Sequence, residues 1–431
     1  MNFLQLALEL SFGSIGVSRP NPAVGAVVVK DGLVVGRGAT QSPGNAHAEV
    51  MALLDAGELA RGAALFVTLE PCCHYGRTPP CTKAIVEAGI SEVYFAHADP
   101  NPAVRGKSRG ILEAAGVKVY EGKDACLRAH AESGWSDSCS AEGCTLLSPD
   151  ESENEGAVVF TEIERFFEAY DYFVRNKKTF VEVKVALSES GFMGMKGGNG
   201  RPAPLNITKQ GAACWNHELR AMSDAILVGA GTLLADNPSL DVRFAHGNSP
   251  VKILWAGHHE FTETEISALK FFSLAGDATS IPRLVFTCVE QPAIKGETIF
   301  LSGNTFEENW TEMIAELSRR GMHRLMVEPG AHLSAKIFND SDERGGKNTP
   351  LWNRLDLWKS TDPSVERFLS QENCEGIAFP GVPDSAVAKE SAIIGPDVLT
   401  VYYPGYFFSG NRQELLLSCL IFSILQIKEP T

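Results

Sequence analysis

Three residues in the first hundred, His47, Cys72 and Cys81, have the types and the order of a zinc site. One imidazole and two thiolates give three protein ligands and leave the fourth tetrahedral position open, as in catalytic rather than structural zinc sites. Glu49 follows the histidine by two residues and is not needed as a ligand. A carboxylate in that place can carry a proton from water to a leaving group. The first part of the chain is therefore predicted to be a zinc-dependent hydrolase.

The second ligand has a rival, because Cys73 directly follows Cys72. We prefer Cys72, since it follows Pro71 and so matches the pairing of H-x-E with P-C-x-x-C in zinc-dependent nucleobase deaminases. The spacing from Cys72 to Cys81 is C-x8-C, which makes this chain a variant of that pattern. Such enzymes hydrolyse an amidine-type C–NH2 bond, which requires a nucleophile as strong as hydroxide near neutral pH.

The loop between the two cysteines contains His74 and Arg77, which would face whatever enters the pocket. A structural zinc site would instead recruit a fourth protein ligand, such as Cys73 or His74, and would leave Glu49 without a role. The residues alone leave both interpretations open, and the catalytic one is preferred.

Length, charge and cysteine use narrow the class of protein. A chain of 431 residues predicts two or three domains. The net charge of −15 argues against a nucleic-acid partner, which normally requires a basic face. Three of the ten cysteines lie within residues 72–81, which indicates metal ligation in a reducing, cytoplasmic compartment. The start of the chain has no basic residue before Arg19, unlike a signal peptide. The apolar run 415–427 is too short to span a membrane, which takes about 20 residues.

Apolar and polar patterning in the first half alternates between strands and helices. The predicted elements are a hairpin over 23–36, helices over 47–56, 82–88 and 112–116, and strands over 65–69, 93–96 and 117–120. This order predicts a mostly parallel α/β sheet with its site at the strand ends. His47 and Cys81 would then lie at helix N-termini, where a thiolate is favoured.

The pattern dissolves between residues 126 and 158 into a polar segment that is predicted to be a flexible spacer, and a second α/β run follows. Its expected strands and helix cover 181–187, 225–229, 251–255, 283–288, 325–328 and, for the helix, 306–320. Within the spacer, Cys139 and Cys144 could form a second metal pair near His130, but free thiols are the preferred interpretation. The run at 229–232 fails the G-x-G-x-x-G fingerprint, so a Rossmann nucleotide site is not supported.

Several segments resemble the bifunctional deaminase–reductase family of riboflavin biosynthesis. In the first half these are 19–25, 47–49, 68–72, 74–81 and 99–102, and in the second half 217–221, 226–229, 236–243, 327–331 and 395–399. The resemblance implies an α/β protein with a cytidine-deaminase-like α/β/α domain over 1–123 and a dihydrofolate-reductase-like α/β domain over 166–405. A polar spacer over 124–165 and an apolar tail of unknown role over 406–431 complete the expected organisation.

The resemblance also implies a function in two steps. The family deaminates 2,5-diamino-6-(5-phosphoribosylamino)pyrimidin-4-one hydrolytically and then reduces the ribosyl group to ribityl with NADPH. One Zn²⁺ per chain, NADPH, a small phosphorylated pyrimidine nucleotide and a homo-oligomer follow as expectations, with neither nucleic acid nor membrane as partner.

Site residues are carried over position by position. Glu49 is the expected catalytic residue, and His47, Cys72 and Cys81 are the expected metal ligands. The expected substrate-binding residues are Asn21, His74, Arg77, Asn101, Lys184, Arg220, Leu240, Arg243 and Glu328. The expected NADPH-binding residues are Ala186, Asn206, Thr232, Asp236, Gly330, Ala331, His332, Leu333, Ser334, Ala335 and Lys336. Arginine suits a phosphate because its guanidinium donates two parallel hydrogen bonds.

The second half departs from the family pattern at a few positions. Ser190 stands in a turn where the family has aspartate, Pro204 and Asn206 replace a serine and a tryptophan, and Pro329 removes a backbone donor near the expected pyrophosphate. A deaminase whose reductase-like half is inactive therefore remains an alternative. A binding module with structural zinc and a nucleic-acid deaminase are the others, the last disfavoured by the acidic charge.

Overall fold

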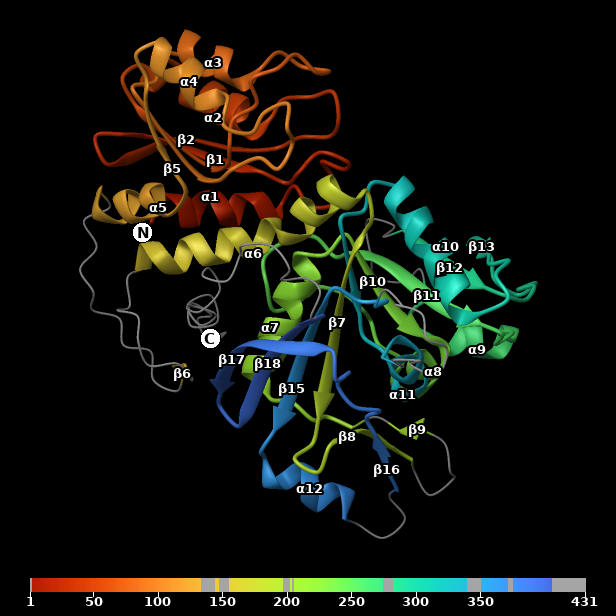
Figure 1. Cartoon of the computed structure of the whole chain (residues 1–431). Coiled ribbons are helices and arrows are strands. Elements are labelled where there is room, and N and C mark those ends of the chain that lie inside the picture. Colours follow the sequence, from red (N-terminus) through yellow and green to blue (C-terminus); the bar gives the residue numbers. More distant parts are fainter. Residues whose placement is uncertain are drawn as a thin grey trace.

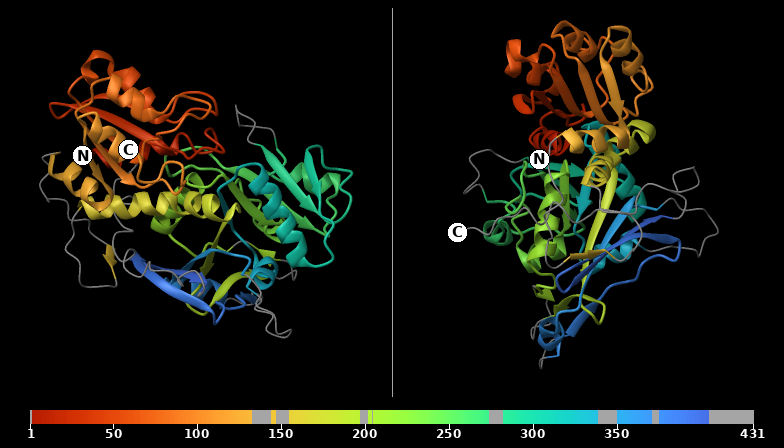
Figure 2. Two further views of the ribbon diagram at one scale, coloured as in Figure 1. Left: turned by 45° about the horizontal axis from the view of Figure 1, so that its top comes forward. Right: turned by 90° about the vertical axis from the view of Figure 1, so that its left-hand side faces the viewer.

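Two large sheets lie on either side of one long helix, α6 (Glu155–Asn176), in the computed structural model of the chain (Figure 1). Figure 2 shows this arrangement from two further directions. The structure describes residues 2–132, 144–146, 155–196, 202–203, 205–273, 282–338, 350–370 and 375–404. Outside the described residues or side chains lie His130, Cys139, Cys144, Pro204 and the tail 406–431. Among the helices described, none has the length and apolar character needed to cross a bilayer.

The N-terminal half is a sheet between two layers of helices. Its elements are α1 (Phe3–Phe12), β1 (Gly25–Lys30), β2 (Leu33–Ala39), α2 (Ala48–Ala56), η1 (Gly57–Ala60), β3 (Ala64–Leu69), α3 (Cys81–Glu87), β4 (Glu92–His97), α4 (Ser108–Ala114), β5 (Lys118–Glu121) and α5 (Gly122–Glu132). The strand order is β2-β1-β3-β4-β5. Helices α2, α3 and α4 cover one face, and α1 and α5 lie with α6 on the other (Figure 1). The predicted α/β/α architecture is confirmed.

The hairpin predicted over 23–36 is confirmed as β1 and β2, whereas the prediction of a mostly parallel first sheet is wrong. Strand β1 pairs antiparallel with both β2 and β3, and only β3–β4 and β4–β5 are parallel. The tight turn at Asp31 and Gly32 explains the first reversal, because both residues have positive φ, 51° and 76°. Two successive positive φ values are typical of the type I′ turn that joins antiparallel strands.

Glycines in β2 let helix α2 approach the sheet closely. A Cβ on Gly36 would lie 2.2 Å from the Ala52 carbonyl oxygen, and one on Gly38 would lie 2.2 Å from that of Ala48. No side chain fits at either distance, so the absence of a Cβ determines how near α2 lies. Because α2 begins directly after His47, this contact also places the first residues of the zinc site.

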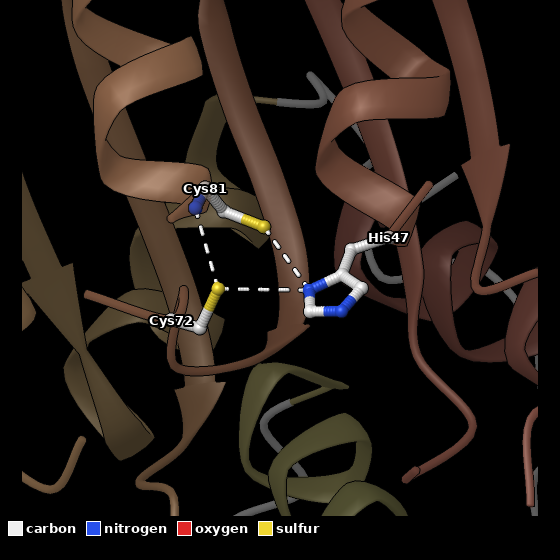
Figure 3. Close-up of side chains that lie close together, drawn as sticks. All are labelled: His47, Cys72 and Cys81. Atoms are coloured by element: carbon white, nitrogen blue, oxygen red, sulfur yellow. Dashed lines mark hydrogen bonds between the residues drawn. The ribbon is translucent and has the colours of Figure 1, made fainter. Parts of the chain in front are cut away.

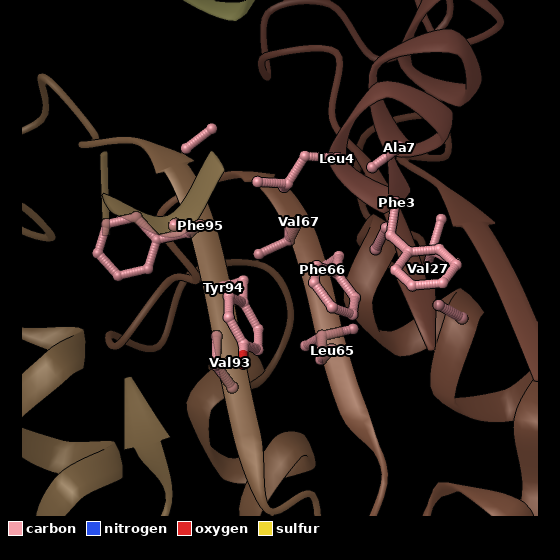
Figure 4. Packing of buried hydrophobic residues seen from close by; sticks show 14 of the residues in the cluster. Phe3, Leu4, Ala7, Val27, Leu65, Phe66, Val67, Val93, Tyr94 and Phe95 are labelled. Atoms are coloured by element: carbon pink, nitrogen blue, oxygen red, sulfur yellow. The ribbon is translucent and has the colours of Figure 1, made fainter. Parts of the chain in front are cut away.

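Aromatic side chains fill the core beneath α1. Phe3 packs on Phe66 with ring centroids 5.1 Å apart, and Phe66 stacks on Tyr94 at 4.6 Å (Figure 4). All three rings are at least nine-tenths buried. Offset contacts of this kind stabilise a core beyond the area that they bury.

The polar spacer expected over 124–165 contains a helix at each end. Helix α5 contributes Ala129 to the N-terminal core, and α6 contributes Ile163 and Phe167. The apolar residues of α6 recur at helical spacing but are separated by many charged residues. The composition of its first part therefore predicts a polar spacer, although the segment is an amphipathic helix. The domain boundaries themselves stay a prediction.

The second half is built on a ten-stranded sheet of order β13-β12-β11-β10-β14-β7-β15-β18-β17-β6 and a three-stranded sheet of order β16-β8-β9. The strands are β6 (Cys144–Leu146), β7 (Phe180–Leu187), β8 (Phe192–Lys196), β9 (Pro202–Ala203), β10 (Ala225–Gly229), β11 (Val251–Gly257), β12 (Arg283–Thr287), β13 (Glu297–Phe300), β14 (Arg324–Val327), β15 (Arg354–Ser360), β16 (Glu375–Ala378), β17 (Ala386–Ile394) and β18 (Asp397–Pro404). The helices are α7 (Gln210–Ala221), α8 (Ala230–Asp236), α9 (Glu263–Ala268), α10 (Phe306–Arg319), α11 (Ala331–Ile337) and α12 (Pro363–Leu369). In the sheet order just given, every neighbouring pair from β13 at the edge as far as β15 is parallel. This confirms the predicted second α/β domain.

A cluster of buried charges lies between α6 and this sheet. Glu182 pairs with Arg324 and, at 3.2 Å, with Arg354, whose Nε also donates to Asp356 at 2.8 Å. Arg165 of α6 lies 3.7 Å from Asp356 and over the ring of a buried tryptophan. Separating buried partners leaves uncompensated charge, so the Arg165–Asp356 pair and the pair of Glu168 with Arg354, at 3.3 Å, attach α6 to the second half. Helix α6 thus belongs to both halves.

Candidate active sites

His47, Cys72 and Cys81 converge in the N-terminal half. His47 directly precedes α2, Cys81 is the first residue of α3, and Cys72 lies in the loop after β3. The His47 Nδ1 atom is 3.6 Å from the Cys72 Sγ and 3.3 Å from the Cys81 Sγ (Figure 3). The Cys81 N–H donates to the Cys72 sulfur at 3.3 Å. All three ligand atoms lie within 4.8 Å of one another.

These separations fit a tetrahedral zinc ion. At ordinary Zn–S and Zn–N bond lengths, a sulfur and a nitrogen ligand lie about 3.5 Å apart. Hydrogen bonding to Cys81 and to His47 lowers the pKa of the Cys72 thiol against the opposing effect of its burial. A thiol that ionises readily is what a metal ligand requires. The three side chains could therefore hold zinc without rearrangement.

Cys73 and His74 do not join this group. The Cys73 thiol instead points at the Ala103 carbonyl oxygen, 3.7 Å away, and His74 is exposed. Neither alternative ligand is therefore placed to complete a four-ligand structural site. The geometry favours Cys72 as the second sulfur ligand.

Glu49 lies beside the three ligand residues, in the first turn of α2, and is 4% exposed. Burial and the neighbouring charge of Cys72 raise the pKa of Glu49 to about 7, and a hydrogen bond with Cys81 opposes this shift. A carboxyl group of that pKa can both accept and release a proton near neutral pH. Its position agrees with the predicted catalytic role.

Asn101 lies in the loop that follows β4. The Asn101 N–H donates to the Asp99 carboxylate at 2.8 Å, and its own side chain accepts from the Ala103 N–H at 3.0 Å. The Cys73–Ala103 contact brings this loop beside the cysteine loop. Arg77, in that cysteine loop, is exposed.

Asn21 lies further toward the second half. It lines a small cavity at the junction of the two halves, together with Tyr170 of α6 and Asp224. The structure thus brings Asn101 to the cysteine loop and places Asn21 at the junction.

The predicted substrate residues of the second half form a cluster around Arg220 and Glu328. Arg220 donates to the Glu328 carboxylate from Nε at 3.1 Å and from Nη2 at 2.9 Å. Its Nη1 donates to the Asp241 carbonyl oxygen at 3.2 Å. The guanidinium of Arg220 is therefore engaged by the protein itself. Burial lowers the pKa of the half-buried Lys184, while Glu328 opposes this shift.

Arg243 and Leu240 lie on the loop that follows α8. Arg243 is exposed and its Nε is 3.2 Å from the Asp241 carboxylate. Its backbone N–H donates to His217 at 2.8 Å, which fixes this part of the loop. Leu240 is buried and has a φ of 56°, so the backbone bends sharply there. Of the two predicted phosphate anchors, Arg243 has the freer guanidinium.

The predicted NADPH residues lie at the ends of neighbouring strands. Parallel strands β10 and β14 bring the segments after them together, so that a Cβ on Gly330 would lie 2.6 Å from Thr232 Oγ1. Ala186 lies on β7 and is half-buried. The exposed members of the predicted set are Asn206, Asp236, His332, Ala335 and Lys336, and Ala331 is half-buried.

Leu333 and Ser334 differ from the rest of the predicted NADPH set. Both are buried, and Leu333 packs in the core of the second half. Solvent does not reach their side chains, so only their backbone could meet a ligand. Helical periodicity explains the difference, because a run of consecutive helix residues cannot all face one side.

Fold and site together define a two-domain enzyme, a zinc-dependent deaminase followed by a reductase. Residues 1–97 match the family model of the cytidine and deoxycytidylate deaminase zinc-binding region, and residues 179–341 match that of the RibD C-terminal domain. Riboflavin biosynthesis protein RibD of Bacillus amyloliquefaciens is 33% identical over 76% of this chain and 78% of its own length. That of Haemophilus influenzae is 32% identical over 78% and 82%.

A solved structure gives the same result. The diaminohydroxyphosphoribosylaminopyrimidine deaminase/5-amino-6-(5-phosphoribosylamino)uracil reductase of Thermotoga maritima matches with a TM-score of 0.63 and 26% identity, over 93% of this chain and 97% of that one. The chain belongs to the RibD family, the bifunctional deaminase–reductases of riboflavin biosynthesis. Its cofactors are zinc in the first half and NADPH in the second.

Three structurally important residues were missed by sequence reasoning. Glu70 immediately precedes the Pro71-Cys72 pair, so its place in the motif could have drawn attention. His97 and Asp171 hydrogen-bond to each other although they are 74 positions apart, and no local pattern signals such a contact.

The ligand assignment predicts opposite outcomes for two adjacent cysteines. Cys72→Ala should lose most of the bound zinc, because two protein ligands hold the ion far more weakly than three. Cys73→Ala is the matched control and should keep a full equivalent. Elemental analysis after dialysis, with circular dichroism to verify folding, measures both. Zinc retained by the first variant and lost by the second would reassign the ligand.

Proposed function

We propose that this chain deaminates 2,5-diamino-6-(5-phosphoribosylamino)pyrimidin-4-one and then reduces the ribosyl group of the product to ribityl with NADPH. The observation that carries the proposal is the three-ligand group of His47, Cys72 and Cys81 with a buried, unligated Glu49 beside it. The Thermotoga relative is named for both activities, and the family match extends over both halves. A small phosphorylated pyrimidine nucleotide is therefore the proposed substrate.

The deamination step requires a carbon–oxygen bond to form and a carbon–nitrogen bond to break. Zinc, when held by the three ligands, supplies a Lewis acid that makes water nucleophilic near neutral pH. Glu49 accepts the proton that water releases and delivers it to the departing amine, which leaves as ammonia. Because Glu49 is buried, the proton stays at the reaction site instead of exchanging with solvent.

Residues around the deaminase opening bind and orient the substrate in this proposal. His74 and Arg77 are exposed on the loop between the two cysteine ligands, so both can move onto an incoming phosphate. Asn101 offers an amide from the neighbouring loop to a ring edge. An amide group both donates and accepts hydrogen bonds, which suits a pyrimidine.

The reduction step takes place in the second half. When bound there, NADPH would supply a hydride to the first sugar carbon, and the ring oxygen released from that carbon would then need a proton. Lys184 is the proposed proton donor, because its burial lowers its pKa and so eases the release of a proton. Glu328 holds Arg220 in place, and Arg243 anchors the substrate phosphate.

We also propose that the protein is cytoplasmic and that it forms a homo-oligomer. The cysteines of the metal group are free thiols, which suits a reducing cytoplasm. We expect a homo-oligomer, as the sequence resemblance implies.

The proposed role of Glu49 predicts a selective loss. Glu49→Gln should keep zinc and folding but lower deaminase turnover by about 10²–10⁴-fold, since the amide cannot accept the proton. Reduction of the deaminated substrate should be unchanged. The exposed Glu58→Gln is the control and should behave as wild type. Near-normal deamination by Glu49→Gln would rule out the assigned role.

The proposed phosphate anchor predicts a change in substrate binding. Arg243→Ala should raise KM for the deaminated, phosphorylated substrate by about 10–100-fold, the usual effect of losing a charge-assisted hydrogen bond. The same variant should treat the dephosphorylated substrate as wild type does. Arg319→Ala, on an exposed helix surface, is the control. Equal KM values for wild type and Arg243→Ala would show that another group binds the phosphate.

A further inference from the structure

Helix α6 contacts the end of strand β4 through the His97 side chain. The His97 Nδ1 hydrogen-bonds to Glu164, and its Nε2 lies 2.8 Å from the Asp171 carboxylate. The imidazole also stacks on Phe167, with centroids 5.1 Å apart and planes 14° from parallel. Only 6% of the His97 side chain is exposed. Two carboxylates of one helix thus hold one buried side chain of the sheet.

The loop held in this way leads to Asn101. Tyr170 of α6 lies close to Asp99, two residues after His97, so that burial and the Asp99 charge together raise the pKa of the Tyr170 hydroxyl. The other side of the loop is attached to the cysteine loop by Glu70, whose carboxylate accepts from the Asp99 N–H at 3.3 Å and from the Ser108 hydroxyl at 2.6 Å. The segment from 97 to 108 therefore contacts the zinc-ligand loop on one side and α6 on the other.

The loop that contains Asn21 is held in a similar way by the second half. Arg19 Nε lies 3.7 Å from Asp224, and the Pro20 carbonyl oxygen lies 3.2 Å from His323 Nε2. Asp224 is itself fixed, because it accepts from the His323 backbone N–H at 2.7 Å. Two of the three loops with a predicted deaminase substrate residue, those of Asn21 and Asn101, thus depend on contacts from α6 or from the second half.

We propose that α6 and the second half position two of the substrate loops of the deaminase, those that contain Asn101 and Asn21, with His97 and Arg19 as positioning residues. The inference rests on the proposed function, because Asn21 and Asn101 matter only if they meet the deaminase substrate. It gives the second half a role in the first reaction that is separate from its own chemistry.

The charge state of His97 strengthens its hydrogen bonds to the two carboxylates of α6. Burial alone would lower the pKa of His97, but the hydrogen bonds to Asp171 and Glu164 outweigh it and raise the pKa to about 9. The imidazole is therefore charged at neutral pH, and both contacts are charge-assisted. Arg175 pairs with the second oxygen of Asp171 at 2.9 Å, which keeps that carboxylate in place.

Substitutions in the full-length protein separate positioning from folding and from catalysis. His97→Met introduces an apolar side chain of similar size that cannot hold either carboxylate, and Asp171→Asn is a nearly isosteric second variant. Both should raise the deaminase KM by about tenfold or more, the effect of losing charge-assisted hydrogen bonds. Zinc content, deaminase kcat and reduction of the deaminated substrate should stay within about threefold of wild type. Arg19→Met should shift the same KM in the same direction.

The control removes an equally close but exposed pair, Asp124 and Arg128 on α5, which lie 2.9 Å apart. Asp124→Asn should leave every measured quantity unchanged. Folded Asp171→Asn and Arg19→Met variants with wild-type KM would overturn the inference, as would a loss of zinc that accounts for the effect. If wild type itself does not deaminate the pyrimidine, the proposed function fails instead, so the two failures are distinguishable.

Discussion

Helix α6 is the element on which the rest of the structure depends, because it is buried against both halves at once. Ile163 and Phe167 fill the core beneath the first sheet, while Arg165 faces the charges buried on the second. Moving the halves apart would expose apolar surface on one side and leave Asp356 and Glu182 with less compensation on the other. The two catalytic halves are therefore held in one arrangement by the helix that joins them.

Only a few residues of the zinc site take part in its chemistry, and several helices and strands are needed to position them. His47 and Cys81 lie where two helices begin, and Cys72 follows the end of a buried strand. The ends of three separate elements must therefore meet at the zinc site. The glycines of β2 determine how near α2 lies, and α2 in turn keeps Glu49 buried. A small change in the packing of α2 on β2 would therefore alter the proton chemistry of Glu49.

Local patterns predicted much of this site, and long-range contacts account for what they missed. His47, Cys72 and Glu49 lie in short motifs, so their types and spacing were sufficient. The engagement of Arg220 by Glu328 joins positions 108 residues apart, and no local pattern could show that its guanidinium is occupied. Strand β15 escaped prediction because two of its charged residues, Arg354 and Asp356, are buried as a pair instead of facing solvent. The antiparallel pairing of β1 with β3 was not predicted, because the order of strands and helices along the chain does not specify which strands become neighbours.

The most direct test of the account follows ammonia and NADPH in one reaction of the purified full-length chain with the diaminopyrimidine nucleotide. We predict equal amounts of ammonia released and NADPH oxidised, with both stopped by a zinc chelator. With the deaminated nucleotide as substrate, the chelator should leave NADPH oxidation unchanged. Ammonia release without oxidation of NADPH from either substrate would contradict the account and leave only the deaminase.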